Sequence, residues 1–433
     1  MSTGTDKQAF EQIGTGRPAL IIRRGPSVYD SRIVREADTL RKLGYEPLIL
    51  AVVSEDVHQT RDEQAGTPVI RLEPTSPFAW ARSLQRKLTR RPDPAGARAD
   101  SPELGGVRSA NPLMRIAVRL HRWMRTLDFY RRAIAVVREV RPALVHCNDY
   151  NTMWVGVAAR LMGSTVVYDS HELWPDRNGR PEPRWWLIAC EFLFVHVAHR
   201  TITASPGYSE VMARRYRIEP PGVIRNIPDA SMQSSALASS NGDSAQTGED
   251  RLALYVGALT TGRGLELSIM ALNHLEDVRL RLVGPARPAY LDELVALADR
   301  EGVSDRVEFA GAVSPQELIE TIREASVGLA LIQPICLSYR MSLPNKVFEY
   351  VAAGLPVLGS DLPAIGSLVA EHRIGLLAAP GEVEDVAAKL GEMLDPERNS
   401  AFREAAREAA RELNWDHEAV RLADQYRTAA GGS

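Results

Sequence analysis

The chain has 433 residues, of which 45% are hydrophobic and 25% are charged, and its formal net charge at pH 7 is −3. This composition excludes a collagen-like, a coiled-coil and a wholly disordered chain, and a pI of about 6.4 argues against a nucleic-acid-binding protein. Because single hydrophobic cores stop growing at roughly 250 to 300 residues, we expect two domains.

The first half of the chain alternates short apolar runs with helical patterns, which predicts a parallel sheet covered by helices. We expect residues 1–17 to be disordered, and residues 18–230 to form a Rossmann-like domain with a flexible insertion at about 92–110. The expected strands are 19–22, 47–53, 144–147, 166–168 and 201–204, and the expected helices are 31–43, 112–141, 152–162 and 185–198.

The alternation restarts after residues 231–250, which are rich in Ser, Gly and Ala and which we predict to be an interdomain linker. A second Rossmann-like domain is expected over 251–412, and residues 413–433 are expected to form a helix that crosses back to the N-terminal domain. Doubly wound sheets bind ligands outside the carboxyl ends of their strands, so two facing domains predict a central cleft. The strands expected here are 252–256, 279–283, 307–309, 327–331 and 356–359, and the helices are 265–275, 290–301 and 346–353.

The sequence also bears on the cellular compartment. Cys147, Cys190 and Cys336 are too few and too scattered for a disulfide framework, and the polar N-terminus lacks the apolar core of a signal peptide. The longest apolar stretch, 185–198, is shorter than the roughly 20 residues that a membrane-spanning helix needs. We therefore expect a cytoplasmic protein in which this stretch is a buried helix or, alternatively, a helix at a membrane surface.

One segment of the chain is strongly basic. Residues 79–140 contain 14 Arg and Lys against 5 Asp and Glu, a net charge of +9. The helical part of this segment interleaves arginines with Trp123, Phe129 and Tyr130, as an amphipathic helix that faces anionic lipid does. A solvated helix face is the alternative. We hypothesise peripheral association with an anionic membrane surface and a lipid-linked acceptor.

A glycine-rich loop joins the strand expected at 252–256 to the helix expected at 265–275. Gly257 and Gly264 let the backbone approach an anion, and Arg263 can bind phosphate oxygens. These features favour a diphosphate, although strand-to-helix turns of this kind are common and an ordinary turn is the alternative.

The segment 339–357 is more specific. Lys346 and Glu349 lie three residues apart, near one face of the first turn of a helix. A lysine offers charge to phosphate and a carboxylate accepts two hydrogen bonds from a ribose diol, whereas spacing alone favours an exposed salt bridge between the two side chains. The whole string YRMSLPNKVFEYVAAGLPV resembles the donor-binding motif of family 4 (group 1) retaining glycosyltransferases, and the similarity extends over most of residues 252–395.

This resemblance implies the two-domain GT-B fold and a nucleotide-diphosphate sugar as the donor substrate, without a cofactor. It assigns Glu349 to the ribose and Asn345, with neighbouring backbone N–H groups, to the transferred sugar. Two positions depart from the family pattern: Met341 stands where relatives place a first glutamate, and Ala258 stands where many place an arginine.

Polar residues also end two strands of the N-terminal domain. Asp149 follows the strand at 144–147, and His171 and Glu172 follow the strand at 166–168. The segments around these residues, 145–151 and 168–175, resemble first-domain motifs of the same family. This resemblance implies that the three side chains position the acceptor or the sugar hydroxyls. Gly25 matches the glycine-bearing loop that lies under the donor phosphates in this family, and a simple turn is the alternative explanation for it. For Asp149, His171 and Glu172 the alternative is that nearby backbone groups satisfy their hydrogen bonds.

Glycosyl transfer develops negative charge on the leaving diphosphate, and Arg263 and Lys346 supply cations for it. The sequence has no Asp-x-Asp motif at a strand end, so no catalytic metal is implied. We predict a metal-independent, retaining glycosyltransferase that acts on a glycan, glycolipid or small-molecule acceptor, polysaccharide biosynthesis being one such role, with Asp149, His171, Arg263 and Lys346 as catalytic residues. A noncatalytic nucleotide-sugar-binding homologue and a nucleotide-sugar epimerase of the same fold are the alternatives.

Overall fold

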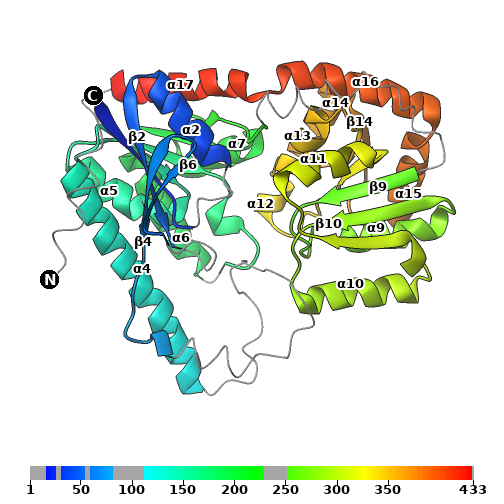
Figure 1. The fold of residues 1–433 in the computed structure, drawn as a ribbon, viewed down its shortest axis with the longest axis horizontal. Coiled ribbons are helices and arrows are strands. Elements are labelled where there is room, and N and C mark those ends of the chain that lie inside the picture. Colours follow the sequence, from blue (N-terminus) through cyan, green and yellow to red (C-terminus); the bar gives the residue numbers. More distant parts are fainter. Residues whose placement is uncertain are drawn as a thin grey trace.

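The computed structural model describes residues 16–25, 31–53, 59–80, 112–180, 182–228 and 251–431, which form two α/β domains (Figure 1). The disordered start expected over 1–17, apart from its last two residues, lies outside the described residues. The same holds for the flexible insertion expected at 92–110 and for the linker expected at 231–250.

The N-terminal domain is built on a sheet with the strand order β3-β4-β2-β1-β5-β6-β7-β8, in which β3 and β4 pair antiparallel and the other described neighbours pair parallel. The order reverses between β1 and β5, where doubly wound sheets bind ligands. The strands are β1 (Arg17–Ile22), β2 (Tyr45–Val52), β3 (Arg61–Gln64), β4 (Thr67–Leu72), β5 (Leu144–Asn148), β6 (Thr165–Ser170), β7 (Arg200–Thr203) and β8 (Gly222–Val223). The helices are α2 (Ser31–Lys42), α4 (Pro112–Val140), α5 (Met153–Leu161), α6 (Arg184–Val197) and α7 (Pro206–Tyr216), with short 3-10 turns η1 (Tyr150–Thr152) and η2 (Trp174–Asp176).

The C-terminal domain repeats this plan with the parallel strand order β11-β10-β9-β12-β13-β14, which reverses between β9 and β12. Each strand is short and mainly apolar, and apolar clusters cover both faces of the sheet. The strands are β9 (Arg251–Val256), β10 (Val278–Val283), β11 (Val307–Gly311), β12 (Val327–Ala330), β13 (Val357–Ser360) and β14 (Gly375–Ala378). The helices are α9 (Leu265–Ala271), α10 (Pro288–Arg300), α11 (Pro315–Glu324), α12 (Leu337–Arg340), α13 (Asn345–Ala352), α14 (Pro363–His372) and α15 (Val383–Met393), with 3-10 turns η4 (Leu272–His274) and η5 (Ser304–Arg306).

Two long helices at the end of the chain connect the domains. In Figure 1, α16 (Pro396–Glu412) lies along the C-terminal domain, and α17 (Trp415–Gly431) continues beside α2 of the N-terminal domain. Trp415, Leu422 and Tyr426 of α17 are buried in the same apolar cluster as Ile33 and Leu40 of α2. The last helix of the chain therefore completes the core of the first domain.

The α6 helix is buried on one side only. Leu187, Cys190 and Phe194 face the core of the N-terminal domain, whereas Trp185 and Phe192 are exposed. The helix therefore has one face that packs on the core and one exposed apolar face. Neither the expected buried helix nor the alternative of a helix at a membrane surface describes it alone. None of the helices in the described part of the chain has the length and apolar character needed to span a lipid bilayer.

Candidate active site

The carboxyl ends of β5 and β6 place Asp149 and His171 side by side. Asn148 pairs with Asp169 in the sheet, and the next residue, Asp149, donates its backbone N–H to the Asp169 carbonyl at 2.8 Å. Asp149 has a positive φ of 67°, a conformation that costs free energy for a residue other than glycine. Its Oδ1 accepts hydrogen bonds from the His171 backbone N–H at 3.3 Å and the Trp174 indole at 3.4 Å, which fixes the carboxylate.

The His171 ring lies between two carboxylates. Its Nε2 is 3.2 Å from Asp169 Oδ2, and its Nδ1 is 3.8 Å from Asp149 Oδ2. Burial alone would lower the pKa of His171, but the charges of Asp169 and Asp149 raise it to about 9. His171 is therefore an imidazolium at neutral pH, and it can donate hydrogen bonds to an anion or a sugar hydroxyl but cannot act as a resting general base.

Asp169 is held by a buried network that the sequence did not single out. Arg32 Nη2 lies 2.6 Å from Asp169 Oδ2, and Arg32 Nε lies 3.0 Å from Glu36 Oε1. Burial alone would raise the pKa of Asp169, but Arg32 and His171 hold it well below the usual range. Glu36, Asp169 and His171 bring potential metal ligands within 4.8 Å of one another, yet the Arg32 guanidinium already supplies the positive charge at this place.

Glu172 follows His171 at the edge of this network. Its side chain is exposed, and its pKa is raised by loss of solvation and by the nearby Asp149 carboxylate. Arg177 and Arg263 act in the opposite direction on the same pKa. Because Arg263 belongs to the C-terminal domain, the charges of the two domains act on each other here.

On the C-terminal domain, Lys346 is buried in the first turn of α13. Its Nζ lies 3.3 Å from the centre of the Tyr255 ring, and a Cβ atom built on Gly257 would lie 3.6 Å from the same Nζ. The ammonium group therefore lies under the start of the glycine-rich loop. Among the described residues it has no hydrogen-bond or ion-pair partner. Burial lowers the pKa of Lys346 well below its usual value, with a further contribution from Arg263, whereas Glu349 raises it.

Arg263 ends the glycine-rich loop and supplies the second cation. Its guanidinium stacks 4.7 Å from the centre of the Tyr339 ring, and no carboxylate within the described residues forms an ion pair with it. The loop needs glycine at position 264, where φ is 76° and a Cβ atom would lie 2.2 Å from the Leu331 carbonyl oxygen. Arg263 and Lys346 therefore lie close enough for their charges to interact, and the Lys346 Nζ has no hydrogen-bond partner among the described residues, an arrangement that favours a bound anion.

Glu349 and Asn345 complete this part of the site. Glu349 is half-buried one turn after Lys346, and burial raises its pKa while Lys346 and Arg35 lower it. Asn345 is exposed at the first position of α13. The influence of Arg35, a residue of α2, means that Glu349 also lies near the N-terminal domain.

Met341 lies at a contact between the domains. The Met341 carbonyl accepts a hydrogen bond from Ser205 Oγ at 2.6 Å, and a Cβ atom on Gly207 would lie 2.9 Å from the same carbonyl. Its side chain packs against the apolar core of the N-terminal domain. The residue that stands in place of the family's first glutamate is therefore an apolar domain contact.

Gly25 follows β1, and its carbonyl accepts a hydrogen bond from the Val52 N–H at 3.2 Å. The neighbouring Arg24 turns toward α4, where it bonds to Thr126 and lies 5.8 Å from the centre of the Phe129 ring. The rest of the loop, residues 26–30, lies outside the described residues.

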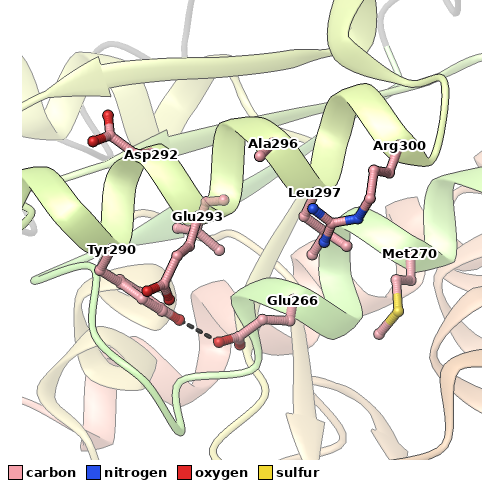
Figure 2. A pocket seen from close by; sticks show the side chains of 9 residues that line it. Glu266, Met270, Tyr290, Asp292, Glu293, Ala296, Leu297 and Arg300 are labelled. Atoms are coloured by element: carbon pink, nitrogen blue, oxygen red, sulfur yellow. Dashed lines mark hydrogen bonds between the residues drawn. The ribbon is translucent and has the colours of Figure 1, made fainter.

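A cavity of about 540 Å³ lies between α9 and α10, lined by residues that include Glu266, Tyr290, Asp292 and Glu293 (Figure 2). The Tyr290 hydroxyl donates a hydrogen bond to Glu266 within it. The acidic lining disfavours a phosphate, so this cavity does not compete with Lys346 and Arg263 as a diphosphate site.

Sequence reasoning missed Arg32, Glu36, His146 and Asp169 as members of the site. Two signals were available: Arg32 and Glu36 are spaced by four residues on α2, and Asp169 directly follows the apolar run 166–168 of β6. Their convergence depends on the register of β1, β5 and β6, which no local pattern reveals.

Two family models match the chain. The model for glycosyl transferases group 1 matches residues 240–412, and the model for glycosyltransferase family 4 matches residues 88–230. Between them they cover most of the chain and fall on the two domains separately.

Curated relatives include D-inositol 3-phosphate glycosyltransferases. The protein from Mycobacteroides abscessus is 26% identical over 65% of this chain and 65% of its own length. The protein from Xylanimonas cellulosilytica is 30% identical over 57% of this chain and 60% of its own length. The matched regions thus span less than two thirds of these two relatives.

Solved structures show the same fold at low sequence identity. A sucrose-phosphate synthase from Thermosynechococcus elongatus superposes with a TM-score of 0.74 at 18% identity, covering 96% of this chain and 100% of its own. Anabaena HepE in complex with UDP superposes with a TM-score of 0.67 at 15% identity, with the same two coverages. These structures show the GT-B fold, and by the two family models, which match residues 88–230 and 240–412, the chain belongs to the family 4, group 1 glycosyltransferases.

Proposed function

We propose that the protein transfers a sugar from a nucleoside-diphosphate sugar to an acceptor hydroxyl, with retention of configuration and without a metal. The observation that carries this proposal is the pair of cations, Lys346 and Arg263, which lie close together without carboxylate partners among the described residues. The two positive charges repel each other, and a bound diphosphate offsets this repulsion because its negative charges attract both groups.

In the proposed reaction, the bond between the anomeric carbon and the diphosphate oxygen breaks while Arg263 and Lys346 stabilise the charge on the leaving diphosphate. The acceptor oxygen forms its bond to the anomeric carbon on the face that the diphosphate leaves, and its proton passes to a diphosphate oxygen. Glu349 binds the ribose hydroxyls and Asn345 contacts the transferred sugar, as the family resemblance implies.

The N-terminal half of the site supplies hydrogen bonds rather than a nucleophile. The His171 imidazolium donates to a sugar hydroxyl, and Asp149, held by the His171 backbone and by Trp174, accepts from the acceptor hydroxyl. Glu172 lines the same region from its exposed position. Gly25 is proposed to lie beneath the donor phosphates.

The experiment is a transfer assay on purified protein with a panel of nucleotide sugars and acceptors, in which NMR reports the anomeric configuration of the product. We expect a retained configuration and an unchanged rate after EDTA treatment. An inverted product contradicts the proposed mechanism, and loss of activity with EDTA that returns on adding Mg²⁺ contradicts metal independence. Donor binding without turnover identifies a noncatalytic homologue, and conversion of the donor sugar without an acceptor identifies an epimerase.

A specific surface supports a second proposal, that the protein works at the cytoplasmic face of an anionic membrane on a lipid-linked acceptor. On α4, one face carries exposed apolar residues at alternating spacings of three and four, and the most exposed are Leu113 at 72% and Trp123 at 66%. The members of this α4 stripe are Leu113, Ile116, Leu120, Trp123 and Leu127.

Two further features fit a lipid surface. The outer face of α6 adds exposed apolar residues, namely Trp185, Trp186, Phe192 and Leu193, and both helices pack on the same apolar cluster of the N-terminal domain. The exposed Arg119 and Arg122 flank the α4 stripe with positive charge. Apolar insertion and attraction to anionic headgroups act together at such a surface.

Co-sedimentation with phosphatidylglycerol and phosphatidylcholine vesicles at low salt tests this second proposal. We expect binding to the anionic vesicles, and loss of binding in the double variant Leu120→Ser and Trp123→Ser. Val420→Ser removes an exposed apolar residue on α17 and serves as the control. Absence of binding at low salt, or equal loss in the control, contradicts the proposal.

A further inference from the structure

The C-terminal helix contributes one polar side chain to the buried network behind His171. The Tyr426 hydroxyl lies 2.9 Å from His146 Nδ1, and both side chains are fully buried. His146 lies on β5, so this contact joins the last helix of the chain to a strand of the site. The two residues are 280 positions apart.

The surroundings of His146 determine which ring nitrogen carries the proton. Its Nε2 faces two carboxylates, Glu36 Oε2 at 3.4 Å and Asp169 Oδ2 at 3.5 Å. A lone pair at Nε2 would face these negative charges, so Nε2 carries the hydrogen and Nδ1 accepts from the Tyr426 hydroxyl. Burial, together with the charges of Glu36 and Asp169, raises the pKa of Tyr426 well above its usual value, so the hydroxyl keeps its proton.

This arrangement reaches His171 through a single shared atom. Asp169 Oδ2 is the oxygen that faces His146, and it also contacts the Arg32 guanidinium and His171 Nε2. If the His146 proton moved to Nδ1, the Nε2 lone pair would repel Asp169 and Glu36. The carboxylate that orients His171 would then shift.

We propose that Tyr426 is a positioning residue for the transfer reaction: its hydroxyl bonds Nδ1 of His146 and so holds the ring whose Nε2–H faces the Asp169 carboxylate beside His171. This inference rests on the proposed function for its effect on the rate, but its structural part stands on the network alone. It also gives the crossing helix α17 a role in the chemistry besides closing the apolar core.

The test compares wild type with Tyr426→Phe, which keeps the ring and removes the hydroxyl, and with Leu422→Ala, which weakens the packing of the same helix outside the network. Nitrogen-15 NMR of histidine-labelled protein reports the tautomer of His146, and steady-state kinetics separates kcat from KM. We expect Tyr426→Phe to remove the Nδ1 hydrogen bond and to lower kcat by about tenfold while the KM for the donor stays unchanged. Leu422→Ala should leave the His146 signals unchanged.

Unchanged His146 signals in Tyr426→Phe overturn the inference, and so does an equal loss of kcat in both variants. A wild-type protein that is inactive with every donor and acceptor refutes the proposed function instead. In that case the NMR signals alone still decide whether the Tyr426 hydroxyl bonds Nδ1 of His146.

Discussion

Lys346 is buried beside Tyr255, and its pKa is lowered well below the usual value because burial removes water from the ammonium group and Arg263 repels its charge, although Glu349 opposes the shift. A bound diphosphate would raise this pKa and favour the ammonium form. We therefore expect donor binding to take up protons when Lys346 is partly deprotonated in the free protein, and to weaken as the pH rises. Isothermal titration calorimetry in buffers of different ionisation enthalpy measures this uptake. Lys346→Arg, which stays charged, should abolish it, and identical enthalpies in all buffers for wild type would count against the site.

The residues of the site differ in how readily the sequence reveals them. Asp149 and His171 are detectable because polar side chains at the ends of buried parallel strands meet at one edge of the sheet. His146 and Arg32 are not, because each is ordinary in its own segment and a decisive partner, Tyr426 for His146 and Asp169 for Arg32, lies more than 100 residues away. Only the family resemblance points to Lys346 and Glu349 as site residues, because their spacing alone favours an exposed salt bridge.

At the level of single elements, α6 is anchored by one buried carboxyl group. Tyr168 and Tyr216 donate hydrogen bonds to Glu191 at 2.8 and 2.6 Å. Burial raises the pKa of Glu191 to about 7, although these bonds and Arg215 oppose the shift. The folded state thus holds this proton more tightly than the unfolded state, so the stabilisation is present at low pH and is lost as the pH rises toward and past 7.

Glu191→Gln should remove this pH dependence. In wild type we expect the free energy of unfolding to fall by up to about 3 kcal/mol between pH 5 and pH 8 from this group, since one pKa unit corresponds to about 1.4 kcal/mol. Urea unfolding at both pH values measures the difference, and the exposed Glu219→Gln is the control. The same decline in wild type and Glu191→Gln would show that Glu191 is not its source.

The elements that the sequence predicted well are those with fully buried, mainly apolar strands, such as β5 and β9. The strands β3 and β4 were not predicted, because neither shows an apolar run. β3 reads Arg-Asp-Glu-Gln, and β4 contains Pro68. For α17, the sequence suggested a crossing helix, but its contact with β5 through Tyr426 depends on tertiary packing alone.

For the molecule as a whole, α16 and α17 lead the chain from the C-terminal domain back to the N-terminal domain. One buried ion pair fixes the start of α17 to the N-terminal domain. Arg225 Nη2 lies 2.7 Å from Glu418 Oε1, and the Arg225 backbone N–H donates to Glu418 Oε2 at 2.9 Å. Glu418→Ala leaves Arg225 without its partner, so we expect a loss of about 3 to 5 kcal/mol. Thermal unfolding measures this loss, with the exposed pair variant Asp424→Ala as the control. A loss no larger than that of the control would contradict the anchoring role.

The two domains contact each other near Met341, and the charges of Arg263 and Glu172 interact across them. We propose that the diphosphate of the donor binds at Arg263 and Lys346 on one domain and faces Asp149 and His171 on the other. Domain closure on donor binding is the expected consequence of a site divided in this way.

The most direct test is donor affinity, measured by thermal shift and donor hydrolysis with UDP-, GDP-, TDP- and ADP-sugars. We predict that one donor stabilises wild type and that Arg263→Ala weakens its binding by about 10- to 100-fold, because a hydrogen bond to a charged group contributes about 1.5 to 3 kcal/mol. Glu349→Ala should also weaken binding, whereas Arg300→Ala, in the outer cavity between α9 and α10, should not. If no donor binds, or if Arg300→Ala alone abolishes binding, the assignment of the site is wrong.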